Sequence, residues 1–223
     1  LAAIAHPEKH LYGLQFHPEV RHTPGGMLIL RQFVLEICGT QPNWTPENII
    51  SQAITAIQNQ AGDARVISAV SGGVDSTVAT ILTHRAIGSQ LRAVFVDTGL
   101  LRLGEADLVE TTLRKQPGFS LTRVNAAESF FSALQGVTEP EEKRHIVGAK
   151  FIETFEKEAT RLGTPTFLVQ GTIYPDVVES SAPDRSQAQR IKSHHNVGGL
   201  PEKMPFKLIE PLRFLFKDEV RLI

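Results

Sequence analysis

The sequence predicts an α/β fold built on a doubly wound, mostly parallel sheet. Short apolar runs alternate with amphipathic helical segments along residues 45–169, which is typical of strands joined by covering helices. The strand-like runs are apolar almost throughout, as expected for strands that are buried on both faces. Residues 1–40 form a separate pattern and lead into the turn-like stretch 40–43. We therefore expect two domains, residues 1–40 and residues 41–223.

The composition is that of an ordinary globular protein. The 223 residues include 23 Lys and Arg against 24 Asp and Glu, which gives a formal net charge of -1. Such a balance provides no general attraction to nucleic acid or anionic lipid. No apolar run approaches the roughly 20 residues that cross a bilayer, and the single cysteine, Cys38, cannot form a disulfide within the chain. We expect a cytoplasmic protein with no nucleic-acid or membrane partner.

The first domain is expected to contain a strand, a loop and a helix. Residues 11–16 form an apolar and aromatic run that ends at His17. After a glycine pair, apolar residues recur at helical spacing through residues 27–37. Cys38 follows among apolar neighbours, which predicts a buried structural thiol. Because the sequence begins in a strand without Met and stops inside a helix at 220–223, we expect a piece of a longer protein.

The second domain is expected to begin with a helix. Thr45 is a hydroxyl N-cap, Pro46 suits the first helical position, and Glu47 lies near the positive end of the helix dipole. An apolar stripe runs through residues 49–57, and Gly62 ends the helix.

The remaining elements alternate along the chain. The expected strands are residues 65–70, 91–96, 120–124 and 166–169, and the expected helices are residues 77–87, 105–115, 128–134 and 141–162. After Gly171 the sequence becomes polar and irregular up to Pro205. A long irregular stretch in a compact domain is usually functional or mobile.

The most informative segment is a glycine turn between a strand and a helix. It comprises Ser71, Gly72, Gly73, Val74, Asp75, Ser76 and Thr77. Glycines permit positive φ and a close approach of the backbone, so successive amides can converge on one anion. The helix N-terminus adds about half a positive charge at the same point. The segment predicts a phosphate-binding loop, and a simple turn capped by Ser and Asp is the alternative.

The type of phosphate loop is indicated by two motifs that the segment lacks and by an acidic residue that it contains. The loop lacks the lysine of a Walker loop and the G-x-G-x-x-G of a dinucleotide fold. It carries Asp75 instead. A carboxylate beside a polyphosphate is repulsive unless a cation lies between them, so Asp75 predicts a bound Mg²⁺ shared with phosphate oxygens.

The motif Ser-Gly-Gly-Val-Asp-Ser at residues 71–76 resembles the loop of the N-type ATP pyrophosphatases, which have a Rossmann-like sheet. These enzymes cleave ATP between the α and β phosphates and adenylylate a substrate oxygen. Val96 and Asp97 end the next strand, where a doubly wound sheet places the nucleoside. We expect the backbone there to contact adenine, while Asp97 either binds a ribose hydroxyl or orders the turn.

Three further stretches are similar to the GMP synthetase family: residues 94–102, 170–180 and 191–201. Residues 141–144, before the long helix, match as well. The resemblance implies that XMP, ATP, glutamine and water give GMP, AMP, pyrophosphate and glutamate. It also implies ATP and Mg²⁺ at the site and a homodimer formed through a further C-terminal domain.

Several charged residues are candidates for the adenylylation step. Lys192, in the irregular stretch, is expected to close over the transferring phosphoryl group as part of a lid. Lys143 and Arg144 form a basic pair at a helix start, where they oppose the dipole, and this suggests an anion such as the XMP phosphate. Asp176 follows a strand and is expected to reach Mg²⁺ or the purine. The alternative is a solvated charge for each basic residue, and loop solvation or capping for Asp176.

Residues 15–20 resemble the end of a type I glutamine amidotransferase domain, so the first domain is expected to be the C-terminal part of that α/β fold. His17 and Glu19 match the family's catalytic histidine and glutamate, which activate a cysteine thiol. Two residues apart at a strand end, their side chains leave the same face and can touch. The family's nucleophile lies upstream of this segment, so this chain is not expected to hydrolyse glutamine by itself.

Other functions remain open from the sequence. One is another pyrophosphatase-loop enzyme, such as NAD synthetase or a tRNA-modifying enzyme. The sequence weighs against tRNA, because it contains neither a basic stripe nor a pair of cysteines for sulfur transfer. Another is a non-catalytic nucleotide-binding module. His194 and His195 are adjacent and lack a third ligand at zinc-like spacing, which favours hydrogen bonding over metal binding.

Overall fold

The computed structural model describes residues 1–181 and 206–223. The chain forms two compact units, Leu1–Asn48 and Ile49–Ile223. Their boundary falls inside the first long helix, α2 (Pro46–Ala61), and the domain division at residues 40–41 stays a prediction. Each unit is described separately below.

The first unit contains a hairpin followed by a helix. Strands β1 (Ala3–His6) and β2 (Leu11–Leu14) pair antiparallel and are joined by the 3-10 turn η1 (Pro7–Lys9). Helix α1 (Gly26–Arg31) continues as the π-helical segment η2 (Gln32–Ile37). The predicted strand, loop and helix are therefore confirmed.

The prediction of a buried Cys38 is wrong. Cys38 is exposed, as are most of the large apolar side chains of α1 and η2. Apolar neighbours in sequence predict burial only when another element covers the helix face. Within this unit no described element covers the end of η2.

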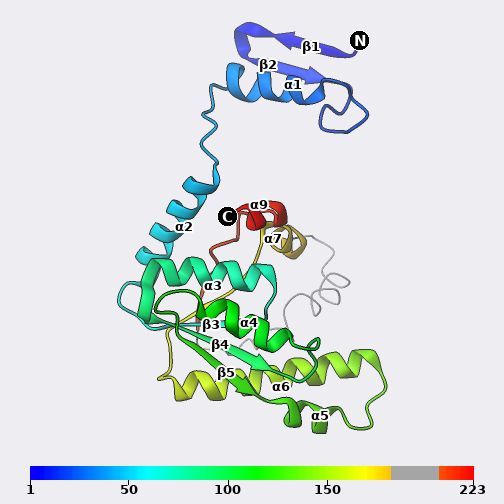
Figure 1. Cartoon of the computed structure of the whole chain (residues 1–223). Helices are drawn as coiled ribbons and strands as arrows, with labels where there is room; N and C mark the ends of the chain where they lie inside the picture. The colour runs from blue at the N-terminus through cyan, green and yellow to red at the C-terminus, as the bar shows by residue number, and fades with distance from the viewer. Residues whose placement is uncertain (182–205) are drawn as a thin grey trace. The chain divides into compact units, whose positions relative to one another are not determined.

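The second unit is built on a five-stranded sheet (Figure 1). The strands are β3 (Val66–Val70), β4 (Leu91–Asp97), β5 (Leu121–Asn125), β6 (Phe167–Val169) and β7 (Lys207–Ile209). They lie in the order β5-β4-β3-β6-β7, and all four pairings are parallel. The predicted α/β class with a parallel sheet is confirmed, and β7 is a strand that the sequence analysis missed.

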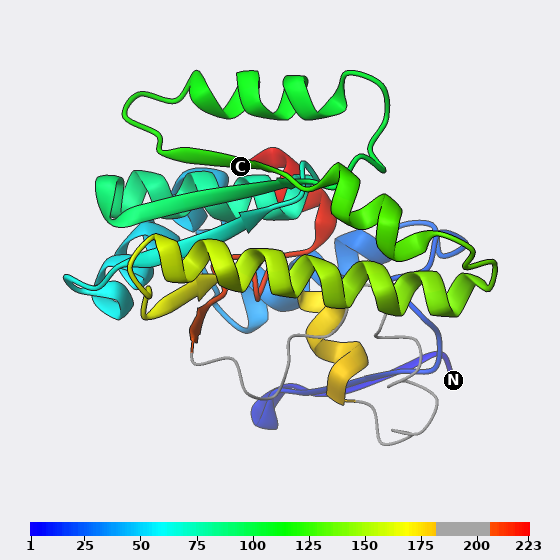
Figure 2. The ribbon, with the colours of Figure 1, turned by 90° about the horizontal axis from the view of Figure 1, so that it is seen from below.

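Helices cover both faces of this sheet. Helices α3 (Val74–Ile87) and α4 (Glu105–Arg114) lie on one face, and α5 (Ala127–Leu134) and α6 (Pro140–Arg161) lie on the other (Figures 1 and 2). Successive side chains along each strand point to opposite faces of the sheet, so each strand contributes to the hydrophobic core on both faces. Val66 packs with α3, whereas its neighbour Ile67 packs with α5 and α6. This arrangement is the doubly wound architecture that the apolar runs predict.

The strand order creates a switch point. From β3 the chain proceeds outward to β4 and β5, and it then returns to place β6 on the opposite side of β3. In such sheets ligands bind outside the carboxyl ends of the strands at this point. The loops that follow β3 and β6 therefore form the expected binding edge.

The segment after Gly171 differs in part from the predicted irregular stretch. Residues Tyr174–Ser181 form helix α7. The carboxylate of Asp176 accepts a hydrogen bond from the backbone N–H of Ile173 at 3.0 Å, which caps the start of this helix. Near the end of the chain, helix α9 (Lys217–Leu222) packs against α3 through Val220, which is fully buried. Among the described residues, no helix is both long and apolar enough to span a membrane.

Candidate functional site

The predicted phosphate loop connects β3 to α3 at the switch point. Gly72 has a φ of 83°, a left-handed conformation that favours glycine. A Cβ atom on Gly72 would lie 2.7 Å from Cγ2 of Val109 on α4, so the loop also approaches α4 too closely for a side chain. Residues 71–74 are exposed. The turn before α3 is therefore open to solvent at the edge where phosphate is expected.

The hydroxyls of two serines make hydrogen bonds within the loop. The Oγ atoms of Ser71 and Ser76 lie 2.9 Å apart, and the backbone N–H of Gly73 donates to Ser71 Oγ at 3.3 Å. Ser76 Oγ also donates to the carbonyl of Gly73 at 3.2 Å. Below the loop, the buried hydroxyls of Ser68 and Thr80 lie 2.5 Å apart and join β3 to α3. These bonds hold the turn in one conformation before any ligand binds.

Asp75, in the first turn of α3, has a partner that the sequence analysis missed. Its Oδ2 atom lies 2.6 Å from Nζ of Lys217, at the start of α9. The side chains of Asp75 and Lys217 are 27% and 41% exposed, so the pair lies at the protein surface. The sequence argument assigned the required cation to Mg²⁺ alone, and the structure adds a lysine at the same carboxylate.

Lys217 reaches the loop because two backbone contacts bring α9 to it. A Cβ atom on Gly171, after β6, would lie 2.9 Å from the backbone carbon of Asp75. A few residues later, the backbone N–H of Tyr174 donates to the carbonyl of Leu215 at 2.9 Å. The loop after β6 therefore touches both the start of α3 and the segment that leads into α9.

The remaining oxygen of Asp75 fits a role as a metal ligand. Oδ1 is buried and has no hydrogen-bond partner among the described residues. Mg²⁺ is commonly held by one or two carboxylates together with substrate phosphates and water. In the described part of the chain, no group of three or more His, Cys, Asp or Glu side chains could hold a metal. A magnesium ion here would thus rest on Asp75 Oδ1 and on the ligand's own oxygens.

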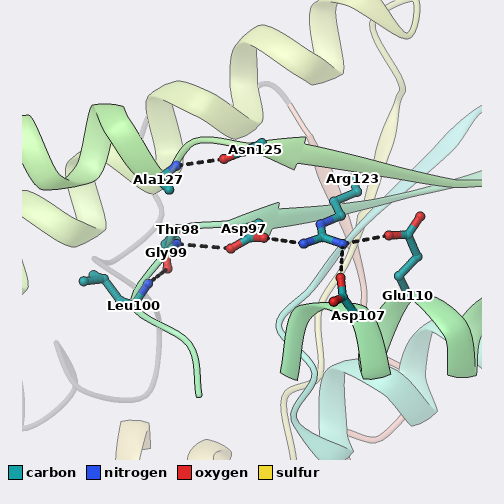
Figure 3. A network of polar contacts seen from close by, with 9 residues as sticks. All are labelled: Asp97, Thr98, Gly99, Leu100, Asp107, Glu110, Arg123, Asn125 and Ala127. Carbon is teal, nitrogen blue, oxygen red and sulfur yellow. Dashed lines mark hydrogen bonds and ion pairs between the residues drawn. The ribbon is translucent and has the colours of Figure 1, made fainter. Parts of the chain in front are cut away.

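The turn after β4 is held by charged side chains (Figure 3). The Oδ1 atom of Asp97 accepts a hydrogen bond from the backbone N–H of Gly99 at 3.1 Å, and Oδ2 accepts one from Arg123 at 2.7 Å. Asp97 therefore orders its turn, one of the two roles that the sequence left open. Val96 is buried among core side chains, and the contact of its backbone with adenine stays a prediction.

The other predicted substrate residues are not brought together by contacts in the described structure. Lys143 and Arg144 are exposed in the first turns of α6, and the guanidinium of Arg144 pairs with Glu141 of the same helix. Asp176 caps α7 as described above. Lys192, His194 and His195 lie outside the described residues.

In the first unit, His17 and Glu19 are in contact. Nδ1 of His17 lies 2.8 Å from Oε1 of Glu19, as the spacing predicts. Both side chains are largely exposed. A hydrogen bond from its own backbone, together with the one from His17, lowers the pKa of the Glu19 carboxyl below its ordinary 4.5. Glu19 is therefore ionised near neutral pH and can orient the imidazole, as the histidine partner of a thiol requires.

Solved structures place the second unit in a fold class. The chain superposes on an ammonia-dependent NAD synthetase from Campylobacter jejuni with a TM-score of 0.56, covering 79% of this chain and 70% of the other at 11% identity. It superposes on the U34-tRNA thiolase NcsA from Methanococcus maripaludis with a TM-score of 0.54, covering 80% and 63% at 19% identity. The predicted pyrophosphatase-type α/β fold is confirmed.

Comparison with curated sequences shows which proteins this chain resembles along its length. The chain is 57% identical over 223 residues to the glutamine-hydrolysing GMP synthase of Syntrophomonas wolfei and 54% identical over 223 residues to that of Pseudomonas aeruginosa. These matches cover all of this chain but 43% and 42% of the relatives, so the chain spans less than half of their length. The glutamine amidotransferase class-I family matches residues 1–37. The predicted resemblance to the GMP synthetase family is therefore confirmed along the whole chain.

Proposed function

We propose that the protein containing this chain makes GMP from XMP. In this reaction ATP adenylylates the O2 oxygen of the xanthine ring, and pyrophosphate leaves. Ammonia from glutamine then attacks the ring carbon, and AMP leaves with the oxygen. The observation that carries the proposal is the 57% identity to a GMP synthase, which extends through both units. The phosphate loop at the switch point supplies the matching site.

The residues of the loop are proposed to bind the pyrophosphate part of ATP. The exposed turn 71–74 and the N-terminus of α3 would receive the β and γ phosphates. The amides of Ser71 and Gly73, which donate to serine hydroxyls in this structure, would exchange those long bonds for phosphate oxygens. Lys217 would add a positive charge, because an ammonium has three donors and the contact with Asp75 uses one. A magnesium ion bound at Asp75 would neutralise charge on the leaving pyrophosphate.

The first unit is proposed to belong to the glutaminase half of the enzyme. The Glu19 carboxylate would hold the imidazole of His17 so that it can take a proton from a cysteine thiol and later return one to the leaving ammonia. The contact of 2.8 Å between the two side chains supports this role. The thiol itself would come from a part of the protein outside these 223 residues.

The other assignments stay proposals as well. We propose that Arg144 and Lys143 bind the XMP phosphate, that Asp176 lies near the purine or Mg²⁺, and that Lys192 closes over the reacting phosphoryl group. Arg144 would leave its ion pair with Glu141 to bind the phosphate. Both side chains are exposed, so breaking this pair costs little free energy. We also propose a cytoplasmic homodimer that pairs through a further domain.

The test of this function uses the full-length protein with Mg·ATP and ammonium chloride. Release of AMP and pyrophosphate is measured with XMP and then with nicotinate adenine dinucleotide as the acceptor. We expect turnover with XMP and no turnover above background with the dinucleotide. Turnover with the dinucleotide alone would indicate an NAD synthetase, and nucleotide binding without turnover with either acceptor would indicate a binding module.

A further inference from the structure

Arg123 is a charged residue in the middle of β5 that connects two parts of the nucleotide-binding edge (Figure 3). Its Nη2 atom donates to Asp97 Oδ2 at 2.7 Å. Its Nη1 atom donates to Asp107 Oδ1 at 2.7 Å and to Glu110 Oε2 at 3.0 Å. One guanidinium thus joins the end of β4 to α4, and its side chain is only 29% exposed.

On the strand side, Arg123 fixes the turn where the nucleoside is expected. Asp97 uses one oxygen for Arg123 and the other for the backbone of Gly99, so the carboxylate cannot rotate without losing a bond. Gly99 has a φ of 73°, and a Cβ atom there would lie 2.7 Å from side-chain atoms of Ala127 and Phe131 on α5. The turn is therefore held between the arginine and α5.

On the helix side, the same arginine fixes a neighbour of the phosphate loop. Asp107 and Glu110 lie one turn apart on α4, and Val109 lies between them in sequence. Val109 is the residue that a Cβ on Gly72 would meet. The register of β3 and β4 pairs Val70 with Phe95, so the two turns leave neighbouring strands. Arg123 therefore links the turn after β4 to the helix that the phosphate loop approaches.

The charges of this cluster favour the ionised forms of Arg123 and Glu110. The three carboxylates, first Asp107 and then Asp97 and Glu110, raise the pKa of Arg123 above its ordinary value. Arg123 and then Arg114 lower the pKa of Glu110. A planar guanidinium can donate from two nitrogens in different directions at once, which a lysine ammonium cannot reproduce with the same geometry.

We propose that Arg123 is a positioning residue of the ATP site, which holds the Asp97–Gly99 turn and α4 in the arrangement that receives the nucleotide. This inference rests on the proposed function only in taking ATP as the ligand. Arg123 does not react. Its removal should weaken the binding of ATP more than it slows the chemical step.

The experiment compares three variants of the full-length protein: Arg123→Ala, Arg123→Lys and the matched control Arg114→Ala. Arg114 is on α4 and pairs with Glu110 at 2.8 Å. It also donates to the backbone carbonyl of Leu121 on β5 at 3.2 Å, but it makes no contact with Asp97. The control therefore loses a link between α4 and β5 without disturbing the turn after β4. Isothermal titration with Mg·ATP should show about a tenfold higher Kd for Arg123→Ala. The Kd should be intermediate for Arg123→Lys and within about twofold of the unmodified protein for Arg114→Ala.

Steady-state kinetics give a second readout. We expect the KM for ATP to rise in Arg123→Ala while kcat and the KM for glutamine change less. An unchanged Kd in Arg123→Ala, or an equal rise in Arg114→Ala, would overturn the inference. If Arg123→Ala does not fold, the comparison of Arg123→Lys with Arg114→Ala decides in the same way. Failure of the proposed function would show separately, as ATP binding by the unmodified protein without XMP-dependent release of AMP.

Discussion

The most consequential single residue in this chain is Lys217, because it provides the loop with a cation that the loop's own sequence lacks. Walker loops carry their lysine within the motif, whereas this loop carries an acid, Asp75. The lysine arrives instead from α9 and contacts that acid at 2.6 Å. If the loop binds a polyphosphate, as proposed, the lysine beside it is supplied by the tertiary structure and not by the motif.

We expect Lys217→Met to weaken the binding of Mg·ATP by about 10- to 100-fold, since hydrogen bonds to charged groups contribute roughly 1.5–3 kcal/mol. Methionine keeps the apolar stem but removes the ammonium. Arg221→Ala is the matched control, because Arg221 is exposed on the same helix. Isothermal titration of both variants measures the effect. Binding by Lys217→Met that equals the unmodified protein would show that the pair with Asp75 is only structural.

The contact between Asp75 and Lys217 could not be predicted from the sequence, whereas the loop itself could. The loop residues 71–77 were predictable because strand, glycines and helix follow one another directly. Asp75 and Lys217 are 142 residues apart, and no local pattern connects them. Arg123 did carry a signal that was not used. An arginine inside a predicted buried strand requires carboxylate partners, because an unpaired buried charge is costly.

At the scale of elements, the alternation of apolar runs predicted four of the five strands of the larger sheet and their covering helices. The missed strand, β7, has only three described residues, too few to show a period. Helix α7 was missed because the whole stretch after Gly171 was interpreted as polar and irregular, although Pro175 suits the first turn of a helix. Asp176 then caps the helix start.

The contact between the phosphate loop and α4 leads to a prediction at this scale. Gly72→Ala should lower stability by about 1–2 kcal/mol for the left-handed backbone and by roughly 1–3 kcal/mol more for overpacking against Val109. The double variant Gly72→Ala with Val109→Ala removes the steric part, but it also loses the packing of Val109 on the core, so Val109→Ala alone is measured as its reference. We therefore expect the double variant to recover part of the ATP binding that Gly72→Ala loses. Thermal unfolding midpoints and Mg·ATP titrations measure the two effects.

Gly118→Ala serves as the control for this pair of variants. Gly118 also has a positive φ, 69°, but a Cβ there would meet nothing within 4 Å. Gly118→Ala should lower stability only through the strain of a left-handed backbone at alanine, and it should bind ATP normally. Normal ATP binding by Gly72→Ala would show that α4 does not constrain the loop.

At the scale of the whole molecule, the chain joins parts of two chemically different sites. The first unit matches the amidotransferase family through residues 1–37 and contains the pair of His17 and Glu19. The second unit carries the phosphate loop. The sequence allowed both sites to be proposed because each motif is local. It could not predict how the sites communicate, because that depends on contacts between parts of the protein that no single motif describes.

This division predicts that the two proposed activities of the full-length protein, glutamine hydrolysis and GMP formation, can be separated. Glu19→Gln should lower the rate of GMP formation from glutamine by about 100-fold or more, because the imidazole loses its orienting carboxylate. GMP formation from ammonium chloride should stay near the unmodified rate, since ammonia needs no hydrolysis of glutamine. Glu8→Gln is the matched control, because Glu8 is another exposed glutamate of the first unit, and it should leave both rates unchanged. If both rates fall together in Glu19→Gln, the carboxylate supports the structure as a whole; if neither falls, Glu19 has no part in the release of ammonia.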